Sequence, residues 1–244
     1  MGQSVQPSPV QQGSGGSGGD AFLDVVRVLF EPTQVFGRVR ERPSFFAPFL
    51  AIIAVQCVLF FVNLPYLEVA VKAQMAAAGP AAQGRPAPSA AMLAVFGLVG
   101  LIVALAIIFL LTALILWVLT SVIGGGQAKF STLLSVAAYS AIPAAVLLTL
   151  VGTIVLHLQG TGQITSPQDM QPALGLDLLS PGAKGFVGAV LKAINPFSIW
   201  GVVLTAIGVS TTQRISKGNG YAIAVTAFVI GLLIAGGMAA VFNR

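Results

Sequence analysis

The side chains that could do chemistry in this chain are few and lie far apart. His157 is the only histidine and Cys57 is the only cysteine. A zinc site needs several His, Cys or carboxylate ligands together, and a hydrolytic triad needs a histidine base beside a serine and an orienting acid. No second histidine, and no cluster of cysteines and carboxylates, lies near His157 in the sequence. We therefore expect no catalytic residue, no metal ligand and no cofactor, and a protein that is not an enzyme.

A glycine-rich segment, GGGQAKF at residues 124–130, superficially resembles a phosphate-binding loop because it places three glycines before Lys129. A P-loop, however, has four residues between its first glycine and a Gly-Lys-Ser/Thr sequence, and that spacing is missing here. The segment separates two long apolar runs, which favours a tight turn between two membrane spans. Gly124, Gly125 and Gly126 would permit the turn, and Lys129 would mark the edge of the membrane.

The composition of the chain indicates a membrane protein. Of its 244 residues, 56% are hydrophobic and 8% are charged, and the mean hydropathy is +0.93. A chain this apolar cannot bury its hydrophobic surface in one soluble core, so the lipid bilayer must be its solvent and first partner. The formal net charge of +5 comes from basic residues scattered between apolar runs. This scatter is typical of topology signals, and we expect no nucleic-acid partner.

Five apolar runs are close to or above the roughly 20 helical residues that a 30 Å hydrocarbon layer requires. They predict an all-α integral membrane protein with five transmembrane helices, at about 46–67, 91–123, 132–157, 197–212 and 221–242. Residues 1–19 are predicted to be a flexible tail, and residues 20–244 the membrane domain. Residues 20–42 are amphipathic, with Pro32 breaking the run. They predict either a helix lying flat at the membrane interface or an ordinary helix packed on the rest of the protein.

The basic residues predict the orientation of the bundle. Seven lie before the first run and in the second and fourth connections, against five on the opposite side. By the positive-inside rule the N-terminus is expected in the cytoplasm and the C-terminus outside. The two outer connections, 68–90 and 158–194, are rich in Ala, Pro, Gln and Gly and are not expected to fold alone. The end of the second, at 182–194, regains a helical pattern.

Polar residues inside the runs are expected to join neighbouring helices. Gln56, Asn63 and Tyr139 belong to this group, and such bonds are the usual contacts of membrane bundles. Pro143 removes a backbone donor from the third run, which predicts a bend and a carbonyl near Tyr139 that other groups must satisfy. Kinks occur in transporters and in passive bundles alike, so the proline does not decide between them.

The fourth run begins with a helix-start signal. Asn195 can cap free N–H groups, and Pro196 suits the first helical position because it lacks an N–H. Trp200 then lies where an amphipathic ring would meet lipid headgroups.

The last run carries small residues at every fourth position, which are Ala227, Gly231, Ala235 and Ala239. Each step of four residues adds about 40° to one full turn, so these positions share one smooth face. Small residues allow two helices to approach closely. We expect this face to pack against the second or fourth span of the same chain, with self-association of two chains as the alternative.

Three segments of the chain resemble the Yip1 family of multispan membrane proteins in its bacterial form. They are LFEPTQVFGRV before the first run, GGGQAKFSTLLSVAAYSAIP in the turn and third run, and INPFSIWGVVLTAIGVSTTQRISKGNGYAIAV leading into the last run. The five spans and cytoplasmic N-terminus of that family agree with the topology predicted above. The resemblance implies a protein of the bacterial inner membrane.

The resemblance also implies a function. It indicates a non-enzymatic scaffold or adaptor that binds a membrane or peripheral protein partner or organises the membrane. A small-solute or ion permease or channel is the alternative, because the bundle has a kinked third run and polar positions within its spans. Eukaryotic members of the family associate with small GTPases. Their acidic, aromatic Gly-Pro motif retains only Glu31 and Pro32 here, and their Gly-Tyr pair is replaced by Ala138 and Tyr139, so GTPase binding is not assigned.

Overall fold

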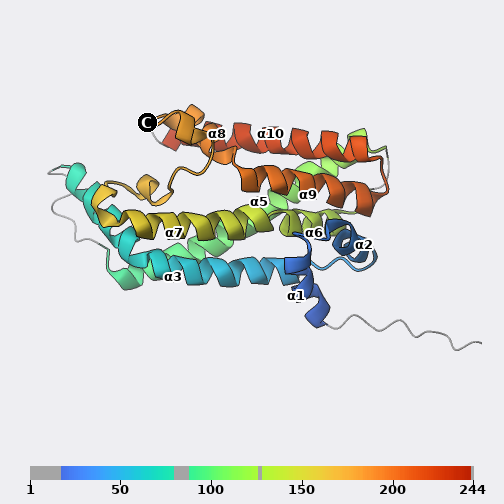
Figure 1. The fold of residues 1–244 in the computed structure, drawn as a ribbon, viewed down its shortest axis with the longest axis horizontal. Helices are drawn as coiled ribbons and strands as arrows, with labels where there is room; N and C mark the ends of the chain where they lie inside the picture. Colours follow the sequence, from blue (N-terminus) through green and yellow to red (C-terminus); the bar gives the residue numbers. More distant parts are fainter. Residues whose placement is uncertain (1–17, 80–87, 126–127, 243–244) are drawn as a thin grey trace, which may run out of the picture.

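The computed structural model describes residues 18–79, 88–125 and 128–242, and every element assigned in them is a helix. The long helices lie side by side along one axis (Figure 1). Four stretches are long and apolar enough to cross a membrane, namely α3 (Phe46–Ala77), α5 (Ala90–Ile123), the third span (Phe130–Gln159) and α10 (Lys217–Phe242). A fifth crossing forms if α8 (Gly185–Ala193) and α9 (Pro196–Gln213), bent by 65°, are taken as one broken span. The predicted all-α membrane fold is confirmed.

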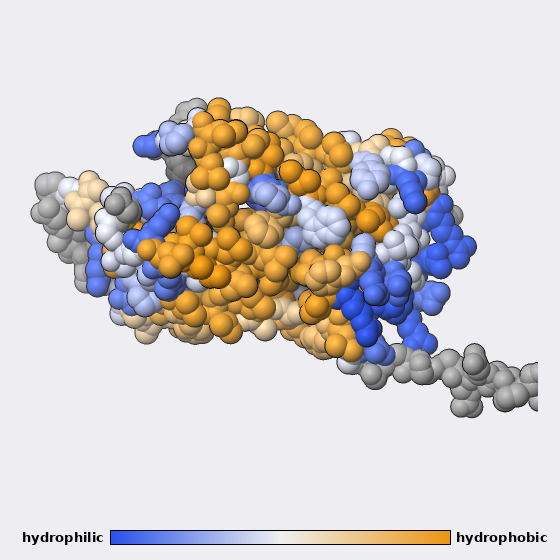
Figure 2. Space-filling model, in the orientation of Figure 1, coloured by the Kyte–Doolittle hydropathy of each residue, from blue (hydrophilic) through white to orange (hydrophobic). Residues whose placement is uncertain are grey.

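The surface of the bundle is that of a membrane protein. Hydrophobic side chains cover the middle of the face shown in Figure 2, and hydrophilic ones gather at its two ends. Large side chains of α5 such as Val95, Phe96 and Ile108 are exposed. Apolar surface of this extent on a folded chain marks contact with lipid.

The first span is longer than predicted. Helix α3 continues through Pro65 to Ala77, so residues 68–77 form helix and not the start of an outer loop. The reason is tertiary packing, because Ala70 is buried in a small hydrophobic core with Leu156 and Ile164. The connection that contributes Ile164 contains the short helices η2 (Thr161–Gln163), η3 (Pro167–Met170) and η4 (Leu176–Leu179). This connection packs against the end of α3. The composition of residues 68–77 alone does not show that contact, so it did not predict the extra turns of α3.

The N-terminal segment forms two helices, α1 (Gly18–Arg27) and α2 (Pro32–Glu41), which we call the N-terminal platform. Pro32 occupies the first turn of α2, where its missing N–H costs nothing. Phe36 of α2 is fully buried against the bundle. Gly208 of α9 makes room for it, since a Cβ at that glycine would lie 3.0 Å from the Phe36 ring. The platform is thus packed on the bundle, one of the two alternatives that its pattern left open.

The turn between α5 and α6 (Phe130–Ser140) uses its glycines differently. Gly125 has a positive φ of 66°, which favours glycine. Gly124 has an ordinary φ, but a Cβ there would lie 2.5 Å from the Thr120 carbonyl oxygen. Gly126 lies outside the described residues.

The fourth span is broken at Asn195. Its Oδ1 accepts a hydrogen bond from the Ser198 N–H at 2.9 Å and so caps α9, as the Asn-Pro signal predicts. Its Nδ2 donates to the Lys192 carbonyl at 3.1 Å, at the end of α8. The buried Asn195 therefore joins the two helices at their bend, with Pro196 as the first residue of α9 and Trp200 exposed one turn later.

The small-residue face of α10 packs inside the chain only at its beginning. Ala227 contacts the main core, but Gly231 and Ala235 are exposed, and a Cβ on Gly231 would meet nothing within 4 Å. The prediction that the whole face, including Ala239, packs against the second or fourth span is therefore wrong. Because the fourth span bends, α8 covers a different side of α10. The centre of that side, Gly236, lies about 140° around the helix axis from Gly231. On that side a Cβ on Gly236 would lie 2.6 Å from the Phe186 ring.

Candidate functional sites

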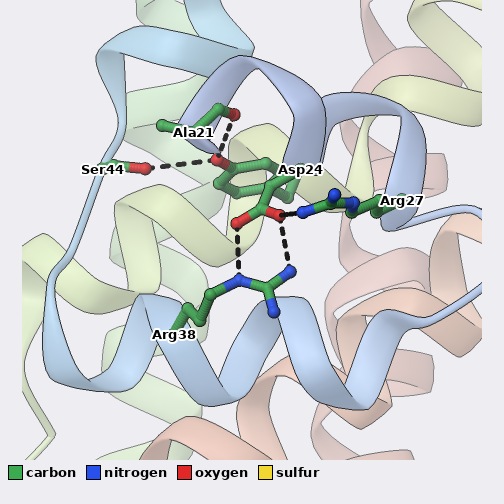
Figure 3. A network of polar contacts seen from close by, with 6 residues as sticks. Ala21, Asp24, Arg27, Arg38 and Ser44 are labelled. Atoms are coloured by element: carbon green, nitrogen blue, oxygen red, sulfur yellow. Dashed lines mark hydrogen bonds and ion pairs between the residues drawn. The ribbon is translucent and has the colours of Figure 1, made fainter. Parts of the chain in front are cut away.

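The N-terminal platform holds an ion pair between a buried carboxylate and a partly exposed arginine (Figure 3). Asp24 of α1 is 4% exposed and accepts from Arg38 of α2 at both oxygens, from Nε at 2.9 Å and from Nη2 at 2.5 Å. Arg27 lies 3.8 Å from the same carboxylate. The hydrogen bond to Asp24 raises the pKa of Arg38 above its ordinary value, against the opposing effect of burial. A two-point contact of this kind fixes the orientation of both side chains, so α1 and α2 are held together.

Tyr139 connects the same platform to the third span. Its hydroxyl donates to the Ala21 carbonyl at 3.1 Å and lies 3.2 Å from Ser44 Oγ. Its ring is fully buried and meets Phe36 edge to face, with ring centroids 6.5 Å apart. Tyr139 was expected to bond a neighbouring helix, and that helix is α1, which precedes the first span. Tyr139 is the anchor of the platform.

A second polar cluster joins α3 to the third span. Gln56 Nε2 donates to the Ala145 carbonyl at 2.6 Å and to Thr149 Oγ1 at 3.3 Å, and Asn63 Nδ2 donates to Thr153 Oγ1 at 2.9 Å. The two amides are seven residues apart, which places them on one face of α3. We call these four side chains, Gln56, Asn63, Thr149 and Thr153, the amide seam. For Gln56 and Asn63 the prediction that polar residues of the spans bond neighbouring helices is confirmed.

Pro143 acts through a local change of helix type. It begins a π-helical segment, η1 (Pro143–Leu148), between α6 and α7 (Thr149–Gln159). The Ala145 carbonyl accepts a hydrogen bond from the Gln56 side chain. It lies six residues beyond Tyr139, near which a free carbonyl was predicted. The predicted free carbonyl near Tyr139 stays a prediction.

His157 lies at the end of the amide seam. Its Nδ1 is 2.9 Å from the Thr153 carbonyl, and its ring centroid is 4.4 Å from that of Tyr66. Within the described part of the chain, no three His, Cys, Asp or Glu side chains lie close enough to hold a metal ion. The arrangement supports packing and hydrogen bonding at this end of the bundle.

A cavity of about 400 Å³ opens beside the amide seam. Its polar lining comes from Gln56, Asn63, Thr149, Thr153, Gln171 and Lys192. Asn63 Oδ1 is buried, and it has no hydrogen-bond partner among the described residues. The volume lies within the range of small-molecule sites, and the lining offers hydroxyls, amides and one cation. No pattern in the sequence indicates this cavity, because its walls come from α3, the third span, the long connection and α8.

The loop that forms one wall of the cavity is fastened by Asp169. Its Oδ2 accepts four hydrogen bonds, from the N–H and hydroxyl of Thr165 and of Ser166, at 2.8 to 3.1 Å. Burial raises the pKa of this carboxyl, but the hydrogen bonds outweigh it, so that the pKa of Asp169 lies below its ordinary value. The charged carboxylate therefore holds the start of η3 in place.

Comparison with known proteins identifies the family. The Yip1 domain model matches residues 26–238. The chain is 30% identical over 216 residues to the membrane protein YknW of Bacillus subtilis strain 168, which covers 85% of each chain. No solved structure matches this chain. Since the matched region runs from the end of α1 through α2 and the amide seam to near the end of α10, the chain belongs to the Yip1 family of membrane proteins and has a bacterial homologue.

Proposed function

We propose that this protein is a non-enzymatic membrane scaffold whose N-terminal platform receives a membrane or peripheral protein partner. The observation that carries the proposal is the outward side of α1. Its exposed apolar side chains are Phe22, Leu23 and Val26, and Phe30 in the turn after α1 is exposed as well. On the opposite side of the same helix Asp24 is buried and paired with Arg38, so this apolar surface is held rigidly in place. A rigid apolar patch is what a docking partner requires.

The spans support a scaffold as well. Their strongest polar groups are occupied in contacts between helices, as with Gln56 and the Ala145 carbonyl or Asn63 and Thr153. A protein that moves charged solutes commonly carries ionisable residues within its spans. Here α5 and the third span hold no Asp, Glu, Lys or Arg, and α3 and α10 hold them only toward one end, at Glu68, Lys72 and Lys217.

Photo-crosslinking tests this proposal. A photoreactive side chain at Val26, which is 60% exposed on α1, is expected to give one reproducible protein adduct in native membranes. The matched control is Val99, 57% exposed on α5, where lipid adducts alone are expected. Arg38→Gln should abolish the Val26 adduct, because it releases α1 from α2. Lipid adducts alone at both positions would contradict the scaffold.

We place the protein in the bacterial inner membrane with its N-terminus in the cytoplasm. The platform and the end of α10 lie at opposite ends of the bundle (Figure 1), which fits an odd number of crossings, and the positive-inside count gives the direction. A reporter fused after Gln159 should behave as external and one fused after Gln127 as internal. The reverse pattern would overturn the orientation.

A permease is the second candidate, favoured by the cavity beside the amide seam and by the π-helical segment in its wall. Reconstituted vesicles separate the two functions. The scaffold predicts no flux of small solutes or ions above that of protein-free vesicles. Flux that Gln56→Leu abolishes would support the permease.

A further inference from the structure

The cavity beside the amide seam is polar although it lies between membrane spans. Its wall is built from Gln56 and Asn63 on α3 and from Thr149 and Thr153 on the third span. At a rise of 1.5 Å per residue, Gln56 and Asn63 lie about 15 Å and about 25 Å along α3 from its first residue. Lipid tails cannot hydrogen-bond such groups, and unpaired polar groups in hydrocarbon are costly. The occupant must therefore be polar at this wall.

Asn63 specifies what the occupant must offer. Its Nδ2 is used by Thr153, while its Oδ1 is buried and lacks a partner among the described residues. An amide oxygen accepts hydrogen bonds and cannot donate them. The matching group on a ligand is therefore a donor, such as a hydroxyl.

Lys192 specifies the charge of the occupant. It is the only charged residue in the cavity lining, and no carboxylate within the described residues forms an ion pair with it. Its backbone carbonyl is bound by Asn195, so the residue sits at the fixed end of α8 while its side chain remains available. A lone ammonium beside hydroxyls and amides attracts a phosphate or another anion.

We propose that this cavity binds the headgroup of an anionic phospholipid of the phosphoglycerol type. The phosphate lies at the Lys192 ammonium, and a free glycerol hydroxyl donates to Asn63 Oδ1. The lipid is favoured over a soluble phosphate because the site is walled by two membrane spans, along which the acyl chains run. This binding is independent of partner docking at the platform, which lies at the other end of the bundle.

Native mass spectrometry of the purified full chain tests the proposal. The protein is delipidated and then offered phosphatidylglycerol or phosphatidylethanolamine in equal amounts. We expect at least a tenfold preference for one molecule of phosphatidylglycerol, which is the order of effect of one hydrogen bond to a charged group. Equal binding of the two lipids would overturn the proposal. Displacement of the lipid by millimolar glycerol phosphate would overturn the choice of a lipid over a soluble ligand.

Variants locate the binding. Lys192→Gln should lower the affinity for phosphatidylglycerol about tenfold, and Lys192→Arg should restore it. The matched control is Lys184→Gln, which removes a cation from the other end of α8, outside the cavity lining, and should bind as the wild type does. All three variants should keep the wild-type melting temperature without lipid, which shows that they fold. Wild-type affinity in Lys192→Gln would overturn the site. Because lipid binding is measured on the purified chain and partner docking in native membranes, either proposal can fail without the other.

Discussion

The N-terminal platform and the cavity are the two polar regions of an apolar bundle, and they differ in how their polar groups are satisfied. In the platform, both oxygens of Asp24 are bonded to Arg38, and the Tyr139 hydroxyl has partners on two segments. In the cavity, Asn63 keeps a buried acceptor without a partner, and Lys192 lacks an ion pair among the described residues. Polar groups that satisfy one another hold the fold together, whereas unused capacity indicates a ligand.

The sharpest way to break this comparison is to remove one half of the platform's ion pair. Arg38→Gln leaves Asp24 buried with Arg27, 3.8 Å away, as its remaining cation. We expect the free energy of unfolding to fall by about 2–3 kcal/mol, below the full cost for a deeply buried pair because Arg38 is partly exposed. Thermal unfolding in detergent measures it. The control is Arg40→Gln, whose partner Glu41 is 3.9 Å away and exposed. Equal losses in the two variants would show that the platform is not held by this pair.

Gly236 and Gly231 form a matched pair on α10 for testing the support of the cavity. Gly236→Leu collides with Phe186 and displaces α8, which carries Lys192, so we expect a loss of about 1–3 kcal/mol and weaker lipid retention. Gly231→Leu meets open space and should change stability by less than about 0.5 kcal/mol. If Gly231→Leu alone lowers the apparent mass in the membrane, its face joins two chains.

The amide seam is expected to respond more weakly than the platform. Gln56→Leu removes the donor to the Ala145 carbonyl, and bonds of this kind between membrane helices contribute about 0.6 to 1.7 kcal/mol. Gln74→Leu, an exposed position near the end of the same helix, is the control and should be neutral. A loss as large as that of Arg38→Gln would contradict the distinction between the two regions.

The smallest effect concerns the loop held by Asp169. The pKa of Asp169 is lowered in the folded protein, so its charged form stabilises the loop at every pH above the ordinary pKa of 3.8. This contribution is lost as the pH falls through the lower pKa of the folded protein. Hydrogen exchange of residues 160–184 should accelerate there, and Asp169→Asn should accelerate it already at pH 7. The melting temperature should stay unchanged. Exchange that is the same in Asp169→Asn as in the wild type would remove this role.

Local signals in the sequence predicted part of the fold. The Asn195–Pro196 start of α9 was correct because capping depends on neighbouring residues, and the apolar runs located the spans because lipid imposes their length. Features that depend on contacts across the chain were not predictable in this way. The extension of α3 needs Ile164, and the exposure of Gly231 follows from the bend at Asn195.

The candidate sites show the same division. Gln56, Asn63 and Tyr139 were singled out because polar groups in apolar runs need partners, but the sequence did not show which partners they have. Asp24 and Arg38 are fourteen residues apart on two helices, so no helical spacing connects them. The carboxylate of Asp24 between the apolar Leu23 and Val25 was the available signal for that pair. Lys192 was counted only as a topology charge, because the cavity forms only when α3, the third span, the long connection and α8 come together in the fold.

The π-helical segment at Pro143–Leu148 gives the third span two separate registers. One additional residue per turn rotates everything after it by about 100° relative to a continuous α-helix. Tyr139 thereby faces the platform, while Thr149 and Thr153 face α3. An α-helical path through the same residues would turn both threonines away from Gln56 and Asn63, whereas deleting Leu147 would remove the additional residue and leave both threonines and Tyr139 pointing as they do. The number of residues in this segment, together with its helix type, thus sets the rotation of one half of the span about the helix axis relative to the other half.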